Sequence, residues 1–300
     1  MNDEQDMDEG RGRWLRTPAG LEAHVVERQG GPLHFWTGGR PGAPWVALLH
    51  GATMDHRMFN AQVPALLADY RVLVWDARGQ GQSQPMGDAF SLELCAEDLV
   101  AIMDHLGAGP AVLVGQSLGG YIAQVAYLRH PRRVQAMAVV GTTCIALPYS
   151  TWEIVALRAS LPLFRLWPYG SLQRTTARAT AIRPDVQAYA REAIGQIGRQ
   201  DFIAIWQAIS VAVDRRGLPG HRIQVPLLLT HGQHDRTGSI RRQAPAWAAY
   251  EPDVHYVVIP DAGHNANQDN PEFFNRVLLD WLRERVPQEG RDSPMTQATS

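Results

Sequence analysis

The sequence contains no lysine, so all 28 of its basic residues are arginine. That absence excludes a Schiff-base lysine and a phosphate-binding P-loop, because both depend on the lysine amine. Cysteine is scarce as well. Cys95 and Cys144 are too few and too isolated for a disulfide framework or a zinc site, and we expect both to be small buried hydrophobic residues.

A strong charge of one sign and a long apolar run are also missing. A net charge of -2 over 300 residues gives no electrostatic reason to expect nucleic acid or an anionic membrane as partner. No run approaches the ~18 apolar residues of a membrane span, and the first ten residues are acidic and polar. We therefore expect a cytoplasmic protein with neither kind of partner. The sequence does not indicate an oligomeric state.

From Leu21 to Arg285 strand patterns and helix patterns alternate along the chain. Repeated strand–helix units imply a parallel sheet that is covered by helices. The alternation breaks between 147 and 220, where only helical patterns occur. The sequence thus predicts an α/β fold: a mostly parallel central sheet with helices on both faces and an inserted helical cap.

Domain boundaries follow from the same pattern. We predict a core built from 21–146 and 221–286, with the cap at 147–220. The polar segments 1–20 and 287–300 are predicted to be disordered tails.

The stretch "VGQSLGG" places Ser117 between a short apolar strand and a predicted helix, Leu118–Arg129. Glycines on both sides complete a Gly-x-Ser-x-Gly pattern. This pattern is typical of a nucleophile elbow, a strained turn in which the glycines let strand and helix approach closely. Alone it is a moderate signal, since short glycine–serine turns are common.

Two further polar groups follow other predicted strands: Asp235 in "HGQHD" and His264 in "PDAGH". In an open parallel sheet, ligands bind outside the carboxyl ends of the strands, so these side chains should meet Ser117 there. A serine hydroxyl needs a base to remove its proton, and histidine needs a carboxylate to fix its tautomer. The three residues therefore predict a Ser-His-Asp triad.

Five stretches together resemble the serine-hydrolase branch of the α/β-hydrolase fold family: "LLHGATMDHRMF", "VLVWDARGQGQS", "VGQSLGG", "LLLTHGQHD" and "PDAGHNANQDNPEFF". The resemblance implies Ser117 as nucleophile, His264 as base and Asp235 as orienting acid, with no cofactor. An elbow of this kind supplies one oxyanion donor, the Leu118 N–H. The family pattern implies the Ala52 N–H, directly after His-Gly, as the second.

Other polar residues invite functional interpretations that we do not adopt. His231, His234 and Asp235 form an H-x-x-H-D run, but ligands so close together rarely converge without further partners, so no metal site is predicted. His50 is expected to support the oxyanion loop through hydrogen bonds. Asp261 shares the loop of His264, and we expect a structural role for it.

The identity of the nucleophile narrows the set of reactions that the chain could catalyse. Epoxide hydrolases of this fold carry aspartate where this chain has Ser117, and a serine suits acyl transfer. The stretch "HGATMDHRMFNAQVPAL" is similar to that of 3-oxoadipate enol-lactonases. We predict hydrolysis of a carboxylic ester or lactone through an acyl-enzyme. Two alternatives stay open: hydrolysis of a carbon–carbon bond in a β-diketone, and a non-catalytic small-molecule receptor on the same scaffold.

The predicted cap is rich in large apolar side chains. Phe202 and Trp206 are four residues apart on one predicted helix, so they share a face. With Trp152, they are our candidates for lining the binding pocket, because such pockets are mainly apolar and aromatic. The expected substrate is a small, uncharged or mainly apolar ester or lactone.

Overall fold

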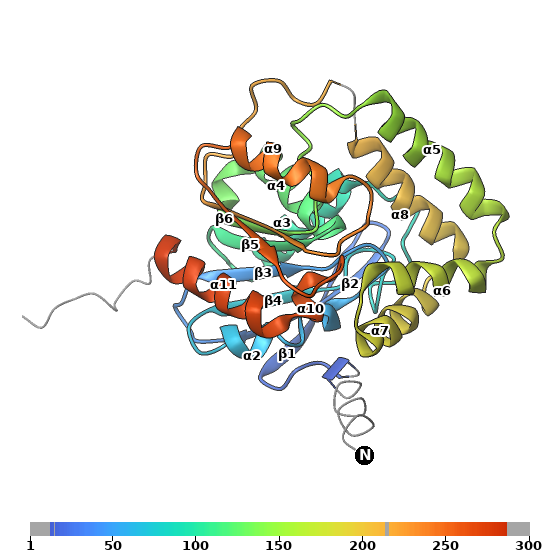
Figure 1. The fold of residues 1–300 in the computed structure, drawn as a ribbon. Coiled ribbons are helices and arrows are strands. Elements are labelled where there is room, and N and C mark those ends of the chain that lie inside the picture. The colour runs from blue at the N-terminus through green and yellow to red at the C-terminus, as the bar shows by residue number, and fades with distance from the viewer. Residues whose placement is uncertain (1–12, 15, 214–215, 287–300) are drawn as a thin grey trace, which may run out of the picture.

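The structure is a computed structural model that describes residues 13–14, 16–213 and 216–286. Its centre is an eight-stranded sheet in the order β1-β2-β4-β3-β5-β6-β7-β8 (Figure 1). β2 runs opposite to the other seven strands, and the pairs from β4 to β8 are all parallel, so the predicted mostly parallel sheet is confirmed. The strands are β1 (Leu21–Arg28), β2 (Gly31–Gly39), β3 (Trp45–Leu49), β4 (Arg71–Trp75), β5 (Ala111–Gln116), β6 (Val134–Val140), β7 (Leu227–Gly232) and β8 (Val254–Ile259).

Helices cover both faces of the sheet, as predicted. In Figure 1, α3, α4 and α9 lie above it and α2 and α11 lie below it. The central strands β3 and β5 are buried along their whole length, because helices pack on both of their faces. The core helices are α2 (Val63–Leu66), α3 (Leu92–His105), α4 (Leu118–Arg129), α9 (Ile240–Tyr250), α10 (Ala266–Asp269) and α11 (Pro271–Arg285), with 3₁₀ turns η1 (His56–Phe59) and η2 (Pro131–Arg133). Both cysteines are buried and free, as expected.

The segment after β3 is less regular than its apolar spacing suggests. A single helix over 58–68 would fit the pattern, but the chain forms only η1 and the short α2. Pro64 stands in the first turn of α2 and has no N–H to donate back to residue 60, so one continuous helix cannot form.

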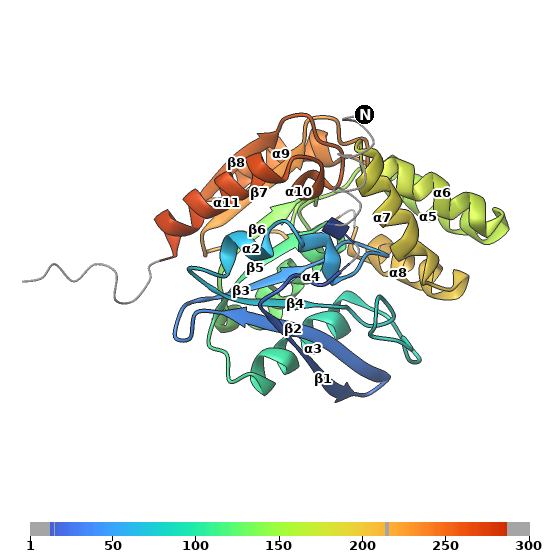
Figure 2. The same ribbon diagram turned by 90° about the horizontal axis from the view of Figure 1, so that it is seen from below.

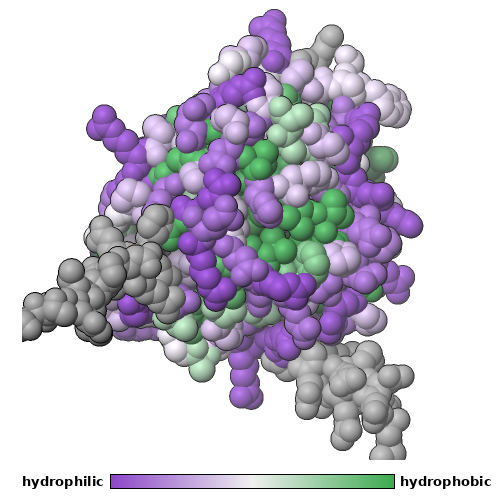
Figure 3. All heavy atoms as spheres, turned by 60° about the vertical axis from the view of Figure 1, so that its left-hand side comes forward, coloured by the Kyte–Doolittle hydropathy of each residue, from purple (hydrophilic) through white to green (hydrophobic). Residues whose placement is uncertain are grey.

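Four helices form the cap between β6 and β7, and all lie within the predicted insertion 147–220. They are α5 (Thr151–Leu166), α6 (Tyr169–Thr180), α7 (Pro184–Gly195) and α8 (Arg199–Ala212). Figure 2 shows them together at one end of the sheet. The face seen in Figure 3 is mostly hydrophilic, with hydrophobic residues in separate patches between the polar ones. In the described part of the chain, no helix has the length and apolar character needed to cross a membrane.

The segment before β1 corrects the expected N-terminal tail. Trp14 is only 2% exposed, and its Nε1–H donates to a carboxylate oxygen of Asp185 in α7 at 3.2 Å. The side-chain amide of Asn60 donates to the carbonyls of Arg13 and Arg16. Burial of one large aromatic ring thus holds this segment against core and cap. The rest of the two expected tails, 1–12 and 287–300, lies outside the described residues.

Candidate active site

Ser117 occupies the turn between β5 and α4. Its backbone has φ +48°, a left-handed conformation that is costly for a residue with a side chain. The flanking glycines make the turn possible. A Cβ on Gly119 would lie 1.9 Å from the carbonyl oxygen of Leu49, and one on Gly115 would lie 2.4 Å from the backbone of Gly119. The chain therefore has the close strand-to-helix packing of a nucleophile elbow.

His264 and Asp235 meet although they are 29 residues apart. The Nδ1 of His264 lies 2.9 Å from a carboxylate oxygen of Asp235, and both residues are buried. The backbone N–H of Thr237 donates to the other oxygen at 2.8 Å. Burial alone would raise the pKa of Asp235, but the nearby His264 imidazole and the hydrogen bonds from His264 and Thr237 hold it below its ordinary value. The carboxylate stays ionised beside the ring that it orients.

The other polar candidates have structural contacts. Asp261 is exposed and shares its loop with His264, and its backbone N–H donates to the side-chain oxygen of Gln233. His231 is held by Tyr256 and by the carbonyl of Gly232. Among the residues that the structure describes, no group of three or more His, Cys, Asp or Glu is placed to hold a metal ion.

The loop after β3 carries the predicted oxyanion donor Ala52. His50 accepts a hydrogen bond from the N–H of Ala77 at its Nε2, so its Nδ1 carries the proton and donates to the carbonyl of Gly51. Burial lowers the pKa of His50, which keeps the ring neutral in this role. Next along the loop, the N–H groups of Thr53 and Met54 donate to Gln80 and Gly51. The supporting role expected for His50 fits these contacts.

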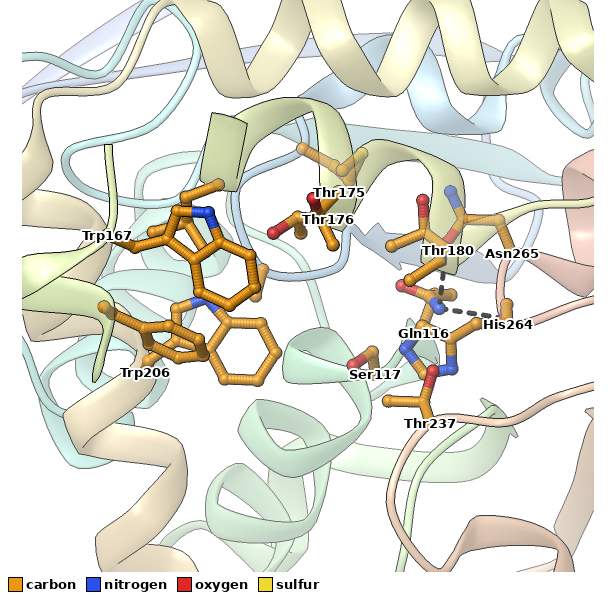
Figure 4. A pocket seen from close by; sticks show the side chains of 15 residues that line it. Gln116, Ser117, Trp167, Thr175, Thr176, Thr180, Trp206, Thr237, His264 and Asn265 are labelled. Atoms are coloured by element: carbon orange, nitrogen blue, oxygen red, sulfur yellow. Dashed lines mark hydrogen bonds between the residues drawn. The ribbon is translucent and has the colours of Figure 1, made fainter. Parts of the chain in front are cut away.

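Ser117 and His264 line one pocket of about 180 Å³ between the core and the cap (Figure 4). At the cap end its walls combine three aromatic rings with three threonines: Phe164, Trp167, Trp206, Thr175, Thr176 and Thr180. None of the described residues that line it is Asp, Glu or Arg. An engineered cavity of about 150 Å³ holds a benzene ring, so this pocket suits a ligand portion of similar size.

The structure separates the three cap residues that the sequence grouped. Trp206 lines the pocket. Phe202 is fully buried and packs its ring against Phe164, Tyr169 and Trp206 inside the cap, so it supports the wall without forming it. Trp152 is 75% exposed on α5, away from the cavity lining. Neither Phe202 nor Trp152 therefore has the pocket-lining position that we expected.

A clamp between the cap and the His264 loop has no counterpart in the sequence analysis. The buried carboxylate of Asp269 accepts hydrogen bonds from the N–H groups of Ile182 and Arg183 in the cap and of Gly263 beside His264. The N–H of Asn265 also donates to the cap carbonyl of Thr180 at 2.7 Å. Asp269 stands in the stretch "NQDNP". Its hydrogen-bond partners are backbone groups, which a sequence does not reveal.

Comparison with known proteins places this site in a family. The model of the alpha/beta hydrolase fold matches residues 44–271. The chain belongs to this family. Across 247 residues, covering 80% of this chain and 94% of the relative, it is 30% identical to a pimeloyl-(acyl-carrier protein) methyl ester esterase of Chromobacterium violaceum.

Solved structures of the family agree over nearly the whole length. A thermophilic esterase from Thermogutta terrifontis is 27% identical with a TM-score of 0.75, covering 90% of this chain and 100% of that one. The enol-lactonase from Burkholderia xenovorans LB400 is 26% identical, also with a TM-score of 0.75, covering 87% of this chain and 100% of that one. The chain is thus similar to hydrolases that act on esters and enol-lactones.

Proposed function

We propose that this protein hydrolyses small, uncharged carboxylic esters or lactones through an acyl-enzyme on Ser117. The observation that carries the proposal is the shared pocket: Ser117 on its strained elbow and His264, itself bonded to buried Asp235, line one cavity. Similarity to an esterase and an enol-lactonase supports the same chemistry.

In the proposed mechanism, the Oγ of Ser117 attacks the substrate carbonyl while the Nε2 of His264 takes its proton. The N–H groups of Ala52 and Leu118 stabilise the resulting oxyanion. Collapse of this intermediate breaks the ester bond, and His264 gives its proton to the departing alkoxide. Water then attacks the acyl-enzyme by the same steps in reverse, which releases the acid and restores Ser117. Asp235 orients the imidazole and stabilises its charged form.

The Ser117→Ala variant tests this assignment. Without the serine hydroxyl no acyl-enzyme can form, so kcat on an activated short-chain ester should fall by ~10⁴-fold or more. The fold should persist, because the strain of the elbow lies in its backbone. Release of the coloured alcohol measures the rate, and an initial burst would report the acyl-enzyme. If the alanine variant keeps more than about a tenth of the activity, the assignment is wrong. If the native protein hydrolyses only β-diketones, or binds esters without turnover, one of the two alternatives replaces it.

The pocket also predicts how kcat/KM changes from one substrate to the next. Its apolar walls and lack of acidic or basic lining residues favour neutral acyl groups. Each buried methylene contributes at most about 0.8 kcal/mol, so kcat/KM should rise ~3- to 4-fold per added carbon until the cavity is full. A series of straight-chain esters with one common alcohol measures this rise. Faster cleavage of dicarboxylic acid esters than of neutral esters of equal length would contradict the uncharged-substrate proposal.

A further inference from the structure

Helix α5 is apolar on two opposite faces, and only one of them packs against other described residues. Ile154 and Phe164 on the inner face pack within the cap. On the other side, Trp152, Val155, Leu163 and Leu166 are 75%, 50%, 58% and 83% exposed. At about 100° per residue, these four fall within an arc of about 80°. We call them the outer face of α5. A soluble protein rarely leaves so many large apolar side chains together in solvent, and nothing in the part of the chain that the structure describes covers this face.

The surroundings of this face are strongly basic. Residues 154–184 contain five arginines and no acidic residue, although the whole chain has a net charge of -2. Four of the arginines are exposed, and in the described part of the chain none of these four makes an ion pair: Arg158, Arg165, Arg174 and Arg178. The expectation of no membrane partner rested on the net charge of the whole chain. That net charge hides this local excess of positive charge.

The same region borders the pocket. Phe164 and Trp167, at the end of α5, line the cavity together with Thr175 and Ala179 of α6. Thr175 and Ala179 are exposed, so the cavity reaches the surface beside the arginines of α6. Figure 1 shows α5 and α6 at the side of the molecule opposite α11. A surface that covers the outer face of α5 would therefore lie next to the entrance.

We propose that the outer face of α5 and its arginines dock the protein on an anionic lipid surface. Helices that lie in a membrane interface combine protruding leucine and tryptophan side chains with arginines that attract lipid phosphates. Both are present here, and Trp152 supplies the amphipathic ring typical of that boundary. A second copy of this chain fits less well, because Arg158 and Arg165 beside the apolar stripe would meet their own like charges. The docking surface does not depend on the proposed hydrolase activity.

Flotation with lipid vesicles tests the proposal on the full-length protein. One vesicle contains equal parts of phosphatidylglycerol and phosphatidylcholine, and the other contains phosphatidylcholine alone. The protein should float with the anionic vesicle, stay unbound with the neutral one, and dissociate as salt is raised, because salt screens charge attraction. Equal binding to both vesicles, or binding to neither, overturns the proposal.

The apolar part of the surface is tested by the double variant Leu163→Gln and Leu166→Gln. Neither side chain lines the pocket or belongs to the core, so the variant should fold, and a circular dichroism spectrum like that of the native protein reports it. Vesicle binding should weaken about 10-fold or more. The matched control is Val25→Gln with Leu128→Gln, which removes two apolar side chains that are 47% and 41% exposed elsewhere. Equal weakening by the two double variants would contradict a specific face. Leu166→Gln alone replaces the pair if the pair fails to fold.

The charged part is tested by Arg158→Gln with Arg165→Gln. Each arginine near an anionic surface contributes about 5-fold in binding, so the pair should weaken vesicle affinity by about 25-fold. Arg132→Gln with Arg241→Gln changes the net charge equally at two exposed positions outside the cap and should have little effect. A second copy as the true partner would appear as a dimer in light scattering that Leu163→Gln and Leu166→Gln abolish while vesicles fail to bind. That result would overturn the lipid proposal.

Discussion

Asp235 and Asp261 both lie near His264, one in space and the other in the sequence, and their surroundings differ sharply. Asp235 is buried at the end of β7 and bonded to the ring, whereas Asp261 is exposed in the loop before His264. Only a buried carboxylate is shielded enough to stabilise a charged imidazole strongly. On these grounds of geometry and solvation, we propose Asp235 and not Asp261 as the orienting acid.

This difference predicts unequal effects of two conservative substitutions. Asp235→Asn should lower kcat by ~10⁴-fold, because the amide favours the wrong imidazole tautomer. Asp261→Asn should stay within a few-fold of the native rate, since its side chain faces solvent. Steady-state rates on one neutral ester measure both variants. Comparable losses from the two changes would leave the acid unassigned.

Single residues also show what a sequence reveals about a site. Ser117, Asp235 and His264 could be proposed from the sequence because each follows a strand, and strand ends of a parallel sheet share one edge. The pocket lining was found only in part. Helical spacing says that Phe202 and Trp206 share a face, but it does not say that Phe202 packs inside the cap while Trp206 reaches the cavity. That division depends on how the cap helices pack against each other.

Among the elements, α5 has an unusually well-defined beginning. Ser150 and Glu153 form a reciprocal capping box, in which the N–H of Ser150 donates to Glu153 at 2.9 Å. Glu153 also accepts from Gln243 of α9 at 2.9 Å and pairs with Arg242, so one side chain ties the cap helix to the core. Although partial burial on its own raises the pKa of Glu153, these hydrogen bonds lower it to about 2.

The lowered pKa predicts a loss of stability in acid. A carboxyl whose pKa falls from about 4.3 in the unfolded chain stabilises the fold above that pH and loses this contribution as pH falls toward 2. Because Glu153 is partly exposed and screened, we expect about 1 kcal/mol at most. Urea unfolding at neutral pH and near pH 3 should show a smaller acid loss for Glu153→Gln than for the native protein. Identical losses would contradict the assigned role.

Regular elements were largely predictable, because apolar runs mark buried strands and helical spacing marks the faces that cover them. The last helix, Pro271–Arg285, begins with a proline, a residue that suits the first position of a helix. The short α10 was missed, since four residues are too few for a periodic signal. The break between η1 and α2 was missed as well. The apolar spacing favours one continuous helix over 58–68, and the single proline within it is the one indication of a break.

At the scale of the whole molecule, Trp14 joins three parts of the chain. It lies before the first strand, its ring is 6.0 Å from that of Tyr189 in α7, and its Nε1–H reaches Asp185. Tyr189 in turn bonds to the backbone and side chain of Asp55 in the core. The local sequence pattern does not predict that Trp14 packs against the cap, because an isolated tryptophan in a polar segment has no periodicity.

Removal of this ring should destabilise the protein as strongly as a core substitution. Trp14→Ala should lower the free energy of unfolding by about 3–5 kcal/mol, through lost burial and the cavity left behind. Trp152→Ala removes the same side chain where it is 75% exposed and should cost about 0.5 kcal/mol or less. Urea unfolding curves of the two variants give the comparison. A small effect at Trp14 would show that the N-terminal segment is dispensable for the fold.

The hydrogen bonds of Asp269 have a consequence for protein engineering. They join cap residues 182–183 to Gly263, and Asn265 joins Thr180, so the cap and the His264 loop are matched parts. A chimera that exchanges only the inserted helices with those of a relative would break this match beside His264. A transplant that carries 263–269 along with the helices would preserve it. The exchangeable module of this fold is therefore discontinuous in sequence, and recombination designed on linear boundaries would cut through it.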